Sequence, residues 1–195
     1  MNFEYIPTSV RGPGSDPNDW ELLAGCACKE ECSADQHCAC LLGAEIFKGP
    51  DHKGYGVRAV REIPKGVFIC EYAGEILNKD EVERRAISSH DHNYTLTIRE
   101  HGEGGIVTTF VDPRHRGNLA RFINHACEPN LSIVIVRIGY TVPHVGLFSN
   151  RVIQAGEEIC YDYGTSTLSL ESGKQCLCGF PSCRKYLPMS ATASE

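Results

Sequence analysis

The sequence predicts a β-rich domain of the α+β class. Six short segments are rich in β-branched and aromatic residues, and Gly, Pro, Asn and Asp separate them, which is the pattern of strands joined by loops. With 195 residues, of which 42% are hydrophobic, the chain is large enough to bury a core of its own. The expected strands are residues 55–60, 67–72, 94–100, 106–111, 131–138 and 144–149.

Two segments favour a helix. Residues 79–88 follow Asn78, a good N-cap residue, and Glu81 stands three positions after it, as in a capping box. Residues 116–124 are a shorter candidate that ends in a polar cluster. Several Pro and Gly residues interrupt any regular pattern over residues 1–25, so we expect a loop-rich lead-in there.

The charge balance and the hydropathy pattern exclude several classes of protein. There are 19 basic and 25 acidic residues, a net charge of −6, which argues against a broad basic face for nucleic acid. We therefore expect no direct sequence-specific binding to nucleic acid. The first residues lack the basic and apolar regions of a signal peptide, and no apolar run approaches the roughly 20 residues that span a bilayer. Neither secretion nor a membrane is expected.

Cysteine is abundant, at 11 of 195 residues, and most of it is tightly spaced. Without a signal peptide, the compartment is expected to keep thiols reduced, so clustered cysteines favour metal ligation over disulfides. Cys70 and Cys160 lie in apolar strand patterns and are expected to be small buried hydrophobes. The N-terminal cluster is Cys26, Cys28, Cys32, Cys38 and Cys40, and the C-terminal cluster is Cys176, Cys178 and Cys183.

Four segments carry chemistry-bearing residues, and each has an ordinary structural explanation when taken alone. A KGYG sequence is most often a tight turn, because glycine adopts a positive φ without strain. Two tyrosines spaced two apart on an expected strand form an aromatic wall of a core as readily as a site. The segments are KGYG (53–56), NY (93–94), RFINHACEPN (121–130) and GEEICYDYG (156–164).

In this order, and followed by CLCGFPSC at 176–183, the segments resemble the SET-domain protein lysine methyltransferases. Proteins of that family transfer a methyl group from S-adenosylmethionine to a lysine amine. NHACEPN resembles the family's NHSCxPN, EEICYDYG its ELxYDYG, and CLCGFPSC its CxCGxxxC zinc motif. The resemblance covers about residues 53–187. EYAGEIL and FVDP look most like the SET half of the SET–mariner transposase fusion proteins, which belong with the heterochromatin-type histone methyltransferases.

The resemblance implies a SET fold of short curved sheets with a C-terminal pseudoknot. The family's pre-SET region has nine cysteines holding three zinc ions, whereas this chain offers five before Gly54, so its pre-SET looks internally truncated. Five thiolates complete at most one closed tetrahedral site, and the alternative that they hold no metal stays open. The implied division is 1–25 N-terminal segment, 26–43 truncated pre-SET, 52–164 SET domain and 172–188 post-SET.

The resemblance also implies a structural zinc ion held by Cys127 together with Cys176, Cys178 and Cys183. Zinc there would tie the C-terminal segment to the NHACEPN motif. Ala126 stands where the family usually has serine, which keeps the small shape but lacks the hydroxyl.

Catalytic roles follow from the same resemblance. Tyr163 matches the catalytic tyrosine, and Tyr161 occupies a Tyr-or-Phe position whose hydroxyl would hold a water and stop methylation early, at mono- or dimethyl-lysine. With Tyr94 and Phe122 they would wall a narrow channel. Desolvation lowers the pKa of a lysine from about 10.4, so no strong side-chain base is required.

The implied cofactor contacts come from several motifs. The KGYG backbone would approach the cofactor closely, Arg121 would meet its polar end, Asn124 and His125 would hold the adenine by main-chain groups, and Leu177 would cover it. The full set is Lys53, Gly54, Tyr55, Gly56, Tyr94, Arg121, Phe122, Asn124, His125 and Leu177.

The implied substrate is a histone tail, with histone H3 favoured, and the implied setting is the nucleosome, in the nucleus and on the chromosome. Acidic residues suit a basic peptide, although a solvated surface is the commoner role for each one alone: Glu71, Glu75, Glu157 and Glu158. A second hypothesis is a chromatin-associated scaffold or zinc module that has lost catalysis with half of its pre-SET.

Overall fold

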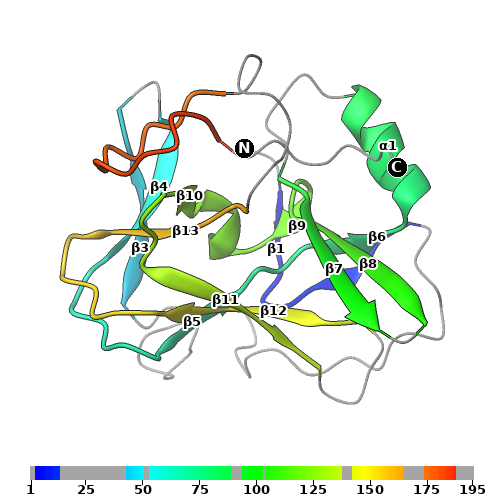
Figure 1. Ribbon diagram of the computed structural model, residues 1–195, viewed down its shortest axis with the longest axis horizontal. Helices are drawn as coiled ribbons and strands as arrows, with labels where there is room; N and C mark the ends of the chain where they lie inside the picture. The colour runs from blue at the N-terminus through cyan, green and yellow to red at the C-terminus, as the bar shows by residue number, and fades with distance from the viewer. Residues whose placement is uncertain are drawn as a thin grey trace.

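The computed structural model describes residues 3–13, 43–50, 53–88, 94–102, 104–137, 142–164 and 174–187. Over these residues the strands form four small sheets, as the β-rich prediction requires, and the single α-helix lies at one end of the molecule (Figure 1). No helix among the described residues is both long and apolar enough to cross a membrane.

The first sheet carries the α-helix. It has the strand order β2 (Val10–Arg11), β6 (Glu75–Leu77), β8 (Gly105–Asp112) and β7 (Leu96–Gly102). Helix α1 (Lys79–Ser88) follows β6 and matches the predicted bounds. The Asn78 side chain caps it by accepting from the Glu81 amide at 2.9 Å, and the Glu81 carboxylate accepts from Arg84 and Arg85.

Arg85 fixes α1 against this sheet and explains two of the sequence motifs. Its guanidinium donates to Glu75 of EYAGEIL and to Asp112 of FVDP, both at 2.9 Å, and to Glu81 at 2.7 Å. Asp112 is completely buried. The hydrogen bonds that Arg85 donates to the three carboxylates outweigh the effect of burial and raise the pKa of Arg85, so it stays charged. Removing one partner of such a buried group is costly, because the remaining charge cannot be solvated.

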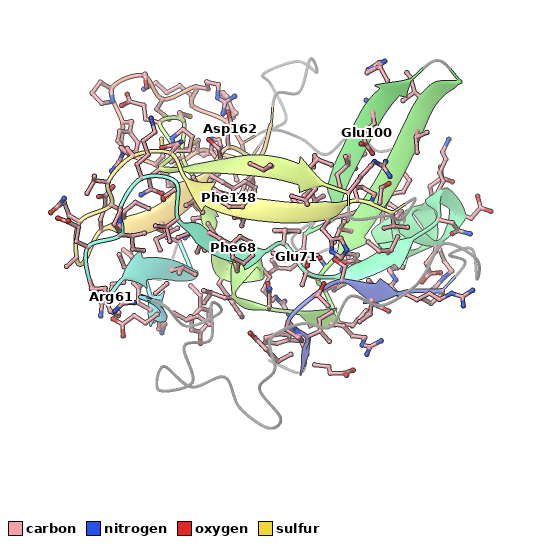
Figure 2. The ribbon with its side chains drawn as sticks, turned by 90° about the horizontal axis from the view of Figure 1, so that it is seen from below. Arg61, Phe68, Glu71, Glu100, Phe148 and Asp162 are labelled. Carbon is pink, nitrogen blue, oxygen red and sulfur yellow. The ribbon has the colours of Figure 1, made fainter. Side chains whose placement is uncertain are left out.

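The second sheet has the order β11 (Leu131–Val136), β12 (His144–Ser149) and β5 (Phe68–Glu71), all antiparallel. Phe68 and Phe148 pack with ring centroids 5.2 Å apart on its outer side (Figure 2). The register shifts between Leu147 and Phe148, which is a β-bulge that bends the sheet.

The third sheet brings the motif segments together. It has the order β10 (Asn124–His125), β13 (Glu158–Tyr161), β4 (Tyr55–Ala59) and β3 (Ala44–Lys48). β10 runs parallel to β13, and the chain after β10 also contacts β13, because the Ala126 and Asn130 amides donate to Tyr161 O and Cys160 O. NHACEPN therefore lies alongside β13, the strand that leads into YDYG.

The predicted helix at 116–124 is wrong in type and length. Arg116–Gly117 is strand β9, which pairs in parallel with β1 (Glu4–Tyr5), and a 3₁₀ helix follows at Leu119–Phe122. Asn118 causes the change, because its side chain accepts from the Ala120 amide at 3.0 Å and donates to Glu71 O at 2.8 Å. An α-helix through Asn118 would break both bonds.

The lead-in also contains more regular structure than predicted, since β1 and β2 both lie within residues 1–25. Between them, Thr8 Oγ1 and the Ser9 amide donate to the Glu71 carboxylate at 2.6 and 3.1 Å, and His144 Nδ1 lies 3.2 Å from it. Glu71 lies beside this N-terminal segment (Figure 2). The N-terminal segment is thus attached to the second sheet.

The six predicted strands are all present, with bounds within two residues of those expected. β3, β6 and β10 were not predicted, in addition to β1, β2 and β9. Cys70 and Cys160 are buried, as predicted. The largest fully buried apolar side chains, which form the centre of the core, are Ile123, Leu131, Leu147, Ile153, Ile159, Val57, Val111 and Val145.

Candidate functional site

The KGYG turn, β10 and β13 meet through one carboxylate. Glu158 accepts from Lys53 Nζ at 2.5 Å and from Asn124 Nδ2 at 2.8 Å. Asn124 Nδ2 also lies 3.1 Å from the main-chain oxygen of Tyr55, to which it donates. Glu158 therefore holds together three segments that are far apart in the sequence, a role that its place in the EEICYDYG motif did not reveal.

Different physical constraints favour glycine at the two glycine positions of KGYG. Gly54 has a φ of +73°, and a Cβ there would meet open space. At Gly56 a Cβ would lie 2.8 Å from the Phe47 ring and 2.9 Å from Glu158 Oε1. Packing against Phe47 and Glu158 thus accounts for Gly56, whereas the open side of Gly54 fits the expected close approach of a cofactor.

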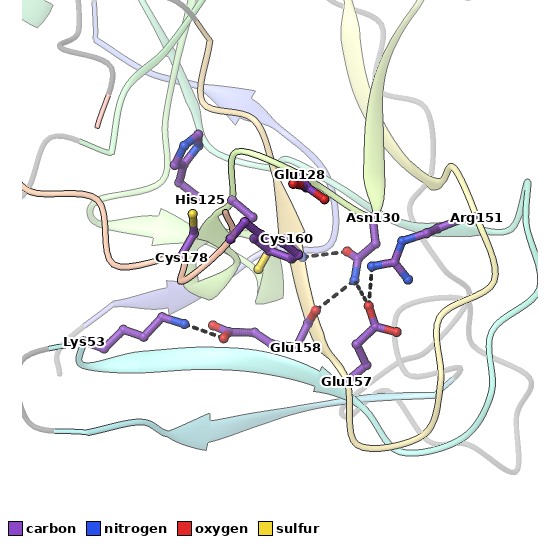
Figure 3. Close-up of a pocket in the computed structure, with 11 residues that line it drawn as sticks. Lys53, His125, Glu128, Asn130, Arg151, Glu157, Glu158, Cys160 and Cys178 are labelled. Atoms are coloured by element: carbon purple, nitrogen blue, oxygen red, sulfur yellow. Dashed lines mark hydrogen bonds and ion pairs between the residues drawn. The ribbon is translucent and has the colours of Figure 1, made fainter. Parts of the chain in front are cut away.

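A cavity of about 180 Å³ opens between the KGYG turn, NHACEPN, β13 and the CLCGFPSC segment (Figure 3). At one end Asn130 Nδ2 donates to the Glu157 carboxylate at 3.1 Å, and Arg151 donates to the same carboxylate. The hydrogen bond from Arg151 lowers the pKa of Glu157 to about 2. The lining residues are Lys53, His125, Ala126, Glu128, Asn130, Arg151, Glu157, Glu158, Cys160, Cys178 and Phe180.

An aromatic cluster lies beside this junction. The rings of Tyr161 and Tyr163 are 4.7 Å apart, and Tyr72 packs edge-on to Tyr161 at 6.0 Å. β13 ends at Tyr161, so Tyr163 lies just beyond the strand that was expected to carry both. The Tyr163 hydroxyl donates to Ile123 O at 2.8 Å. Tyr163 is nevertheless 38% exposed, so part of its ring faces open space.

Tyr72, which sequence reasoning placed on a strand and gave no further role, supports Tyr161. Its ring packs edge-on against the Tyr161 ring, and its hydroxyl donates to Tyr94 O at 2.7 Å. Tyr72 therefore links the aromatic cluster to the main chain at Tyr94.

The three phenols are unsuited to act as bases. Burial raises the pKa of Tyr72, Tyr161 and Tyr163 above the ordinary value of 10. All three therefore keep their protons at neutral pH. They can donate hydrogen bonds and present ring faces, but they do not remove a proton from a substrate.

Arg121 lies among aromatic rings. Its guanidinium carbon is 4.4 Å from the Phe3 ring centroid, 4.9 Å from that of Tyr94 and 5.3 Å from that of Phe122. One Nη donates to Arg114 O at 3.2 Å. Within the described part of the chain, its buried Nε has no hydrogen-bond partner, which leaves a donor for a ligand.

Four cysteines meet on the far side of His125. The Sγ atoms of Cys127, Cys176, Cys178 and Cys183 all lie within 4.8 Å of one another, and those of Cys127 and Cys176 are 3.9 Å apart. A disulfide would need about 2 Å, whereas four thiolates around a zinc ion at about 2.3 Å are separated by about 3.8 Å. The spacing fits a tetrahedral metal site and excludes a disulfide.

The protein surrounds these sulfurs with donors. The amides of Arg184 and Lys185 donate to the sulfurs of Cys127 and Cys183, each at 3.3 Å. Burial raises the pKa of Cys178, but main-chain hydrogen bonds outweigh it and bring the pKa to about 6. Burial raises the pKa of Cys176 to about 12. A metal ion would therefore have to displace at least one proton on binding.

Most of the residues expected at the site are brought together, with some differences. Leu177 is 41% exposed next to the cysteine cluster and is not part of the cavity lining, where Cys178 and Phe180 stand instead. Phe180 was not identified from the sequence. Asn93 and the N-terminal cysteines, Cys26, Cys28, Cys32, Cys38 and Cys40, lie outside the described residues.

The four acidic residues considered for a basic peptide all have partners in the protein. Glu71 accepts from Thr8 and Ser9, and Glu75 pairs with Arg85. Glu157 pairs with Arg151, and Glu158 with Lys53. Their charges thus help to join elements of the fold, and their role towards a basic peptide stays a prediction.

A family model described as "SET domain" matches residues 54–164, which is more than half of the chain. The chain is 41% identical to the "probable histone-lysine N-methyltransferase set-23" of Caenorhabditis elegans, with all of both chains covered. That alignment spans 244 positions against 195 residues here, so at least 49 of its positions are gaps in this chain.

Solved structures are similar as well. The methyltransferase domain of human histone-lysine N-methyltransferase SETMAR superposes with a TM-score of 0.76 at 34% identity, covering 96% of this chain and 90% of that one. Arabidopsis thaliana SUVH6, solved in complex with S-adenosylmethionine, gives a TM-score of 0.61 at 35% identity and covers 74% of this chain and 32% of that one.

Proposed function

The chain belongs to the SET-domain family, and from this premise we propose that it transfers methyl groups from S-adenosylmethionine to a lysine of a histone tail, with histone H3 as the favoured substrate. One observation carries the proposal: the KGYG turn, NHACEPN and the β13 segment that leads into YDYG converge on a single cavity, and the tyrosine cluster follows directly at the end of β13. The family and the fold account for the class of reaction, and this convergence supports activity in this chain.

The tyrosine cluster suits the acceptor. A lysine must lose its proton before it attacks, and an apolar channel lowers its pKa by penalising the charged form. The rings of Tyr161 and Tyr163 would wall such a channel and tolerate the cationic methylated product. Because their hydroxyls stay protonated, the tyrosines would orient the amine, and the proton would leave to solvent before the transfer.

The cavity suits the cofactor. S-adenosylmethionine would supply an activated methyl group on a sulfonium centre. Lys53, His125 and Phe180 line the cavity and would hold the adenosine part, and the free Nε of Arg121 would meet the carboxylate at the polar end. Tyr55 and Leu177 lie outside the cavity lining but are 43% and 41% exposed, and a ligand that extends beyond the cavity would cover them. Tyr163 would face the methyl group, near the Ile123 carbonyl.

The cysteine cluster suits a structural zinc ion. Four thiolates fill the tetrahedral coordination of zinc and leave no open position for a substrate. The ion would join Cys127, directly after β10, to the C-terminal segment that carries Phe180, and so close one wall of the cavity. Zinc would organise the site and take no part in the transfer.

A scaffold without activity is the second candidate, and the gaps against the set-23 relative favour it. We place a large part of those gaps in the pre-SET, since five cysteines stand where the family has nine. We propose that the shortened pre-SET spans residues 26–43 and that the SET domain spans residues 52–164. Strand β3 (Ala44–Lys48) pairs with β4 and adds an edge strand to the SET domain.

The test is transfer of labelled methyl from S-adenosylmethionine to each isolated core histone and to nucleosomes. Label on histone H3 supports the full proposal, and label on another histone corrects the substrate. Absence of label on every histone, with the cofactor bound, would favour the scaffold. A nuclear and chromosomal location is proposed on the same basis, and imaging of the tagged chain in cells tests it.

A further inference from the structure

We propose that His125 is a positioning residue that links the cysteine cluster to Tyr163. On one side of the ring, Nε2 lies 3.4 Å from Cys127 Sγ. On the other side, Nδ1 lies 3.2 Å from the Tyr163 amide. The inference rests on the proposed function, in which the cluster holds a metal ion and Tyr163 acts in methyl transfer.

The hydrogen bonds fix the tautomer of His125. A backbone amide is always a donor, so Nδ1 must accept from Tyr163 and carries no proton. The ring proton is then on Nε2, from which it points to the Cys127 sulfur. Arg184 Nη2 lies 3.3 Å from Nε2 but cannot accept, and its hydrogen bond goes to Asp162 Oδ1 at 2.6 Å. A single arrangement of protons satisfies all of these groups.

Packing leaves the ring little freedom to adopt another orientation. The His125 side chain is 1% exposed. Its ring centroid is 5.3 Å from that of Tyr163, and its backbone pairs with Tyr161 on β13. A movement of the Cys127 sulfur would therefore be passed through a rigid ring to the backbone that carries the Tyr163 side chain.

Both bonds change the chemistry at their ends. A donor to a thiolate withdraws charge from it and holds the ligand in place, which is the usual role of groups around a metal's ligands. The Arg184 amide donates to the same Cys127 sulfur at 3.3 Å, so donors from two parts of the chain surround Cys127. At the other end, a fixed amide sets the direction in which the Tyr163 hydroxyl points.

Two substitutions separate the two ends of the ring. His125→Asn places an amide oxygen near the position of Nδ1, so it keeps an acceptor for Tyr163 and loses the donor to Cys127. His125→Gln places an amide nitrogen near the position of Nε2, so it keeps the donor and loses the acceptor. His101→Asn and His101→Gln, on the exposed end of β7, are the matched controls.

The contact between His125 and the Cys127 sulfur is tested with cobalt(II) bound in place of zinc. Loss of a donor makes the thiolate a stronger charge donor, so His125→Asn is expected to move the sulfur-to-cobalt absorption band to longer wavelength. It is also expected to release the metal to a chelator about tenfold faster, the lower end of the range for such partners. His125→Gln is expected to leave both values near those of the wild type.

The hydrogen bond between the Tyr163 amide and His125 is tested by the rate of hydrogen exchange at that amide, which does not depend on catalysis. His125→Gln is expected to speed this exchange about tenfold or more, while His125→Asn keeps it slow. With active enzyme, His125→Gln is expected to lower kcat more than it raises KM for the cofactor, because misplacement of a catalytic group slows the reaction itself.

The pattern across the two variants decides the inference. The crossed result, with Asn affecting the metal and Gln affecting the amide, supports it. Equal effects of both variants on both readouts, or no effect of either, would overturn it and leave His125 as a packing residue. A wild type that takes up no metal overturns both the inference and the proposed zinc site. A wild type that binds cobalt but methylates no histone counts against the proposed function alone, since the band and the amide exchange still test His125.

Discussion

Removal of the Tyr163 hydroxyl separates a catalytic role from a structural one. Among the residues that the structure describes, this hydroxyl makes one hydrogen bond, 2.8 Å to Ile123 O. Such a bond contributes about 1 kcal/mol to stability, which in a chain of this size shifts Tm by about 2–4 °C. Tyr163→Phe is therefore expected to stay folded at 25 °C and to bind the cofactor almost as well as the wild type.

The effect on methyl transfer should be much larger than that on stability. Loss of one positioned donor typically slows catalysis by about 100-fold or more, which corresponds to about 2.7 kcal/mol in the transition state. The assay is single-turnover transfer of labelled methyl to a histone H3 peptide, with cofactor affinity and Tm measured on the same preparation. Tyr186→Phe, which removes a hydroxyl from an exposed tyrosine of the C-terminal segment, is the control.

Two results would refute this reasoning. A rate for Tyr163→Phe within about threefold of the wild type would mean that the hydroxyl serves only the Ile123 hydrogen bond. A loss of cofactor affinity as large as the loss of rate would mean that Tyr163 acts through binding. Either result would remove Tyr163 from the catalytic role proposed for it.

Three further outcomes are expected. Cys127→Ser and Cys178→Ser should each abolish stoichiometric zinc binding and weaken cofactor binding, because one ion joins NHACEPN to the C-terminal segment. Full zinc occupancy of either variant in native mass spectrometry would exclude the proposed ligand set. Tyr161→Phe should raise the number of methyl groups added at a nearly unchanged first-transfer rate, and identical peptide mass spectra would reduce Tyr161 to packing. The hydrogen bond with Glu71 raises the pKa of His144 above 6.5, so its stabilising effect is complete below pH 6.5 and is lost as the pH rises through the raised value. His144→Gln should therefore flatten the fall of Tm with rising pH above 6.5, and an unchanged slope would show that the pair does not contribute.

Local patterns were sufficient to predict α1 and six of the thirteen strands in the described part of the chain. Each predicted strand is a β-branched run between turn residues, and α1 begins at Asn78, whose side chain caps it. The 3₁₀ helix at Leu119–Phe122 was not predictable in this way, because Asn118 is held by Glu71 O, which is distant in the sequence. β1 and β2 were missed for a related reason, since two-residue strands have no pattern apart from their partners.

The candidate site also combines residues that a local motif indicates with residues that only the fold brings into place. Motif resemblance picked out Tyr161, Tyr163, Cys127 and the three cysteines of the C-terminal cluster as candidates, because each stands in a short characteristic sequence. The structure brings the four sulfurs within 4.8 Å of one another and the two tyrosine rings to 4.7 Å. Motif resemblance did not reveal Tyr72 or Phe180, whose roles depend on which segments meet in space. It also left open the function of the acidic residues, which the structure explains by their partners: Glu71, Glu75, Glu157 and Glu158.

The most direct test of the account is the product formed by the 195-residue chain itself on a histone H3 tail peptide. The chain is loaded with zinc and saturated with S-adenosylmethionine, a parallel sample carries Tyr163→Phe, and the peptide is analysed by mass spectrometry. The account predicts monomethyl- and dimethyl-lysine from the wild type, and about 100-fold less of either from the variant. Unmodified peptide from a wild type that holds both zinc and cofactor would contradict it.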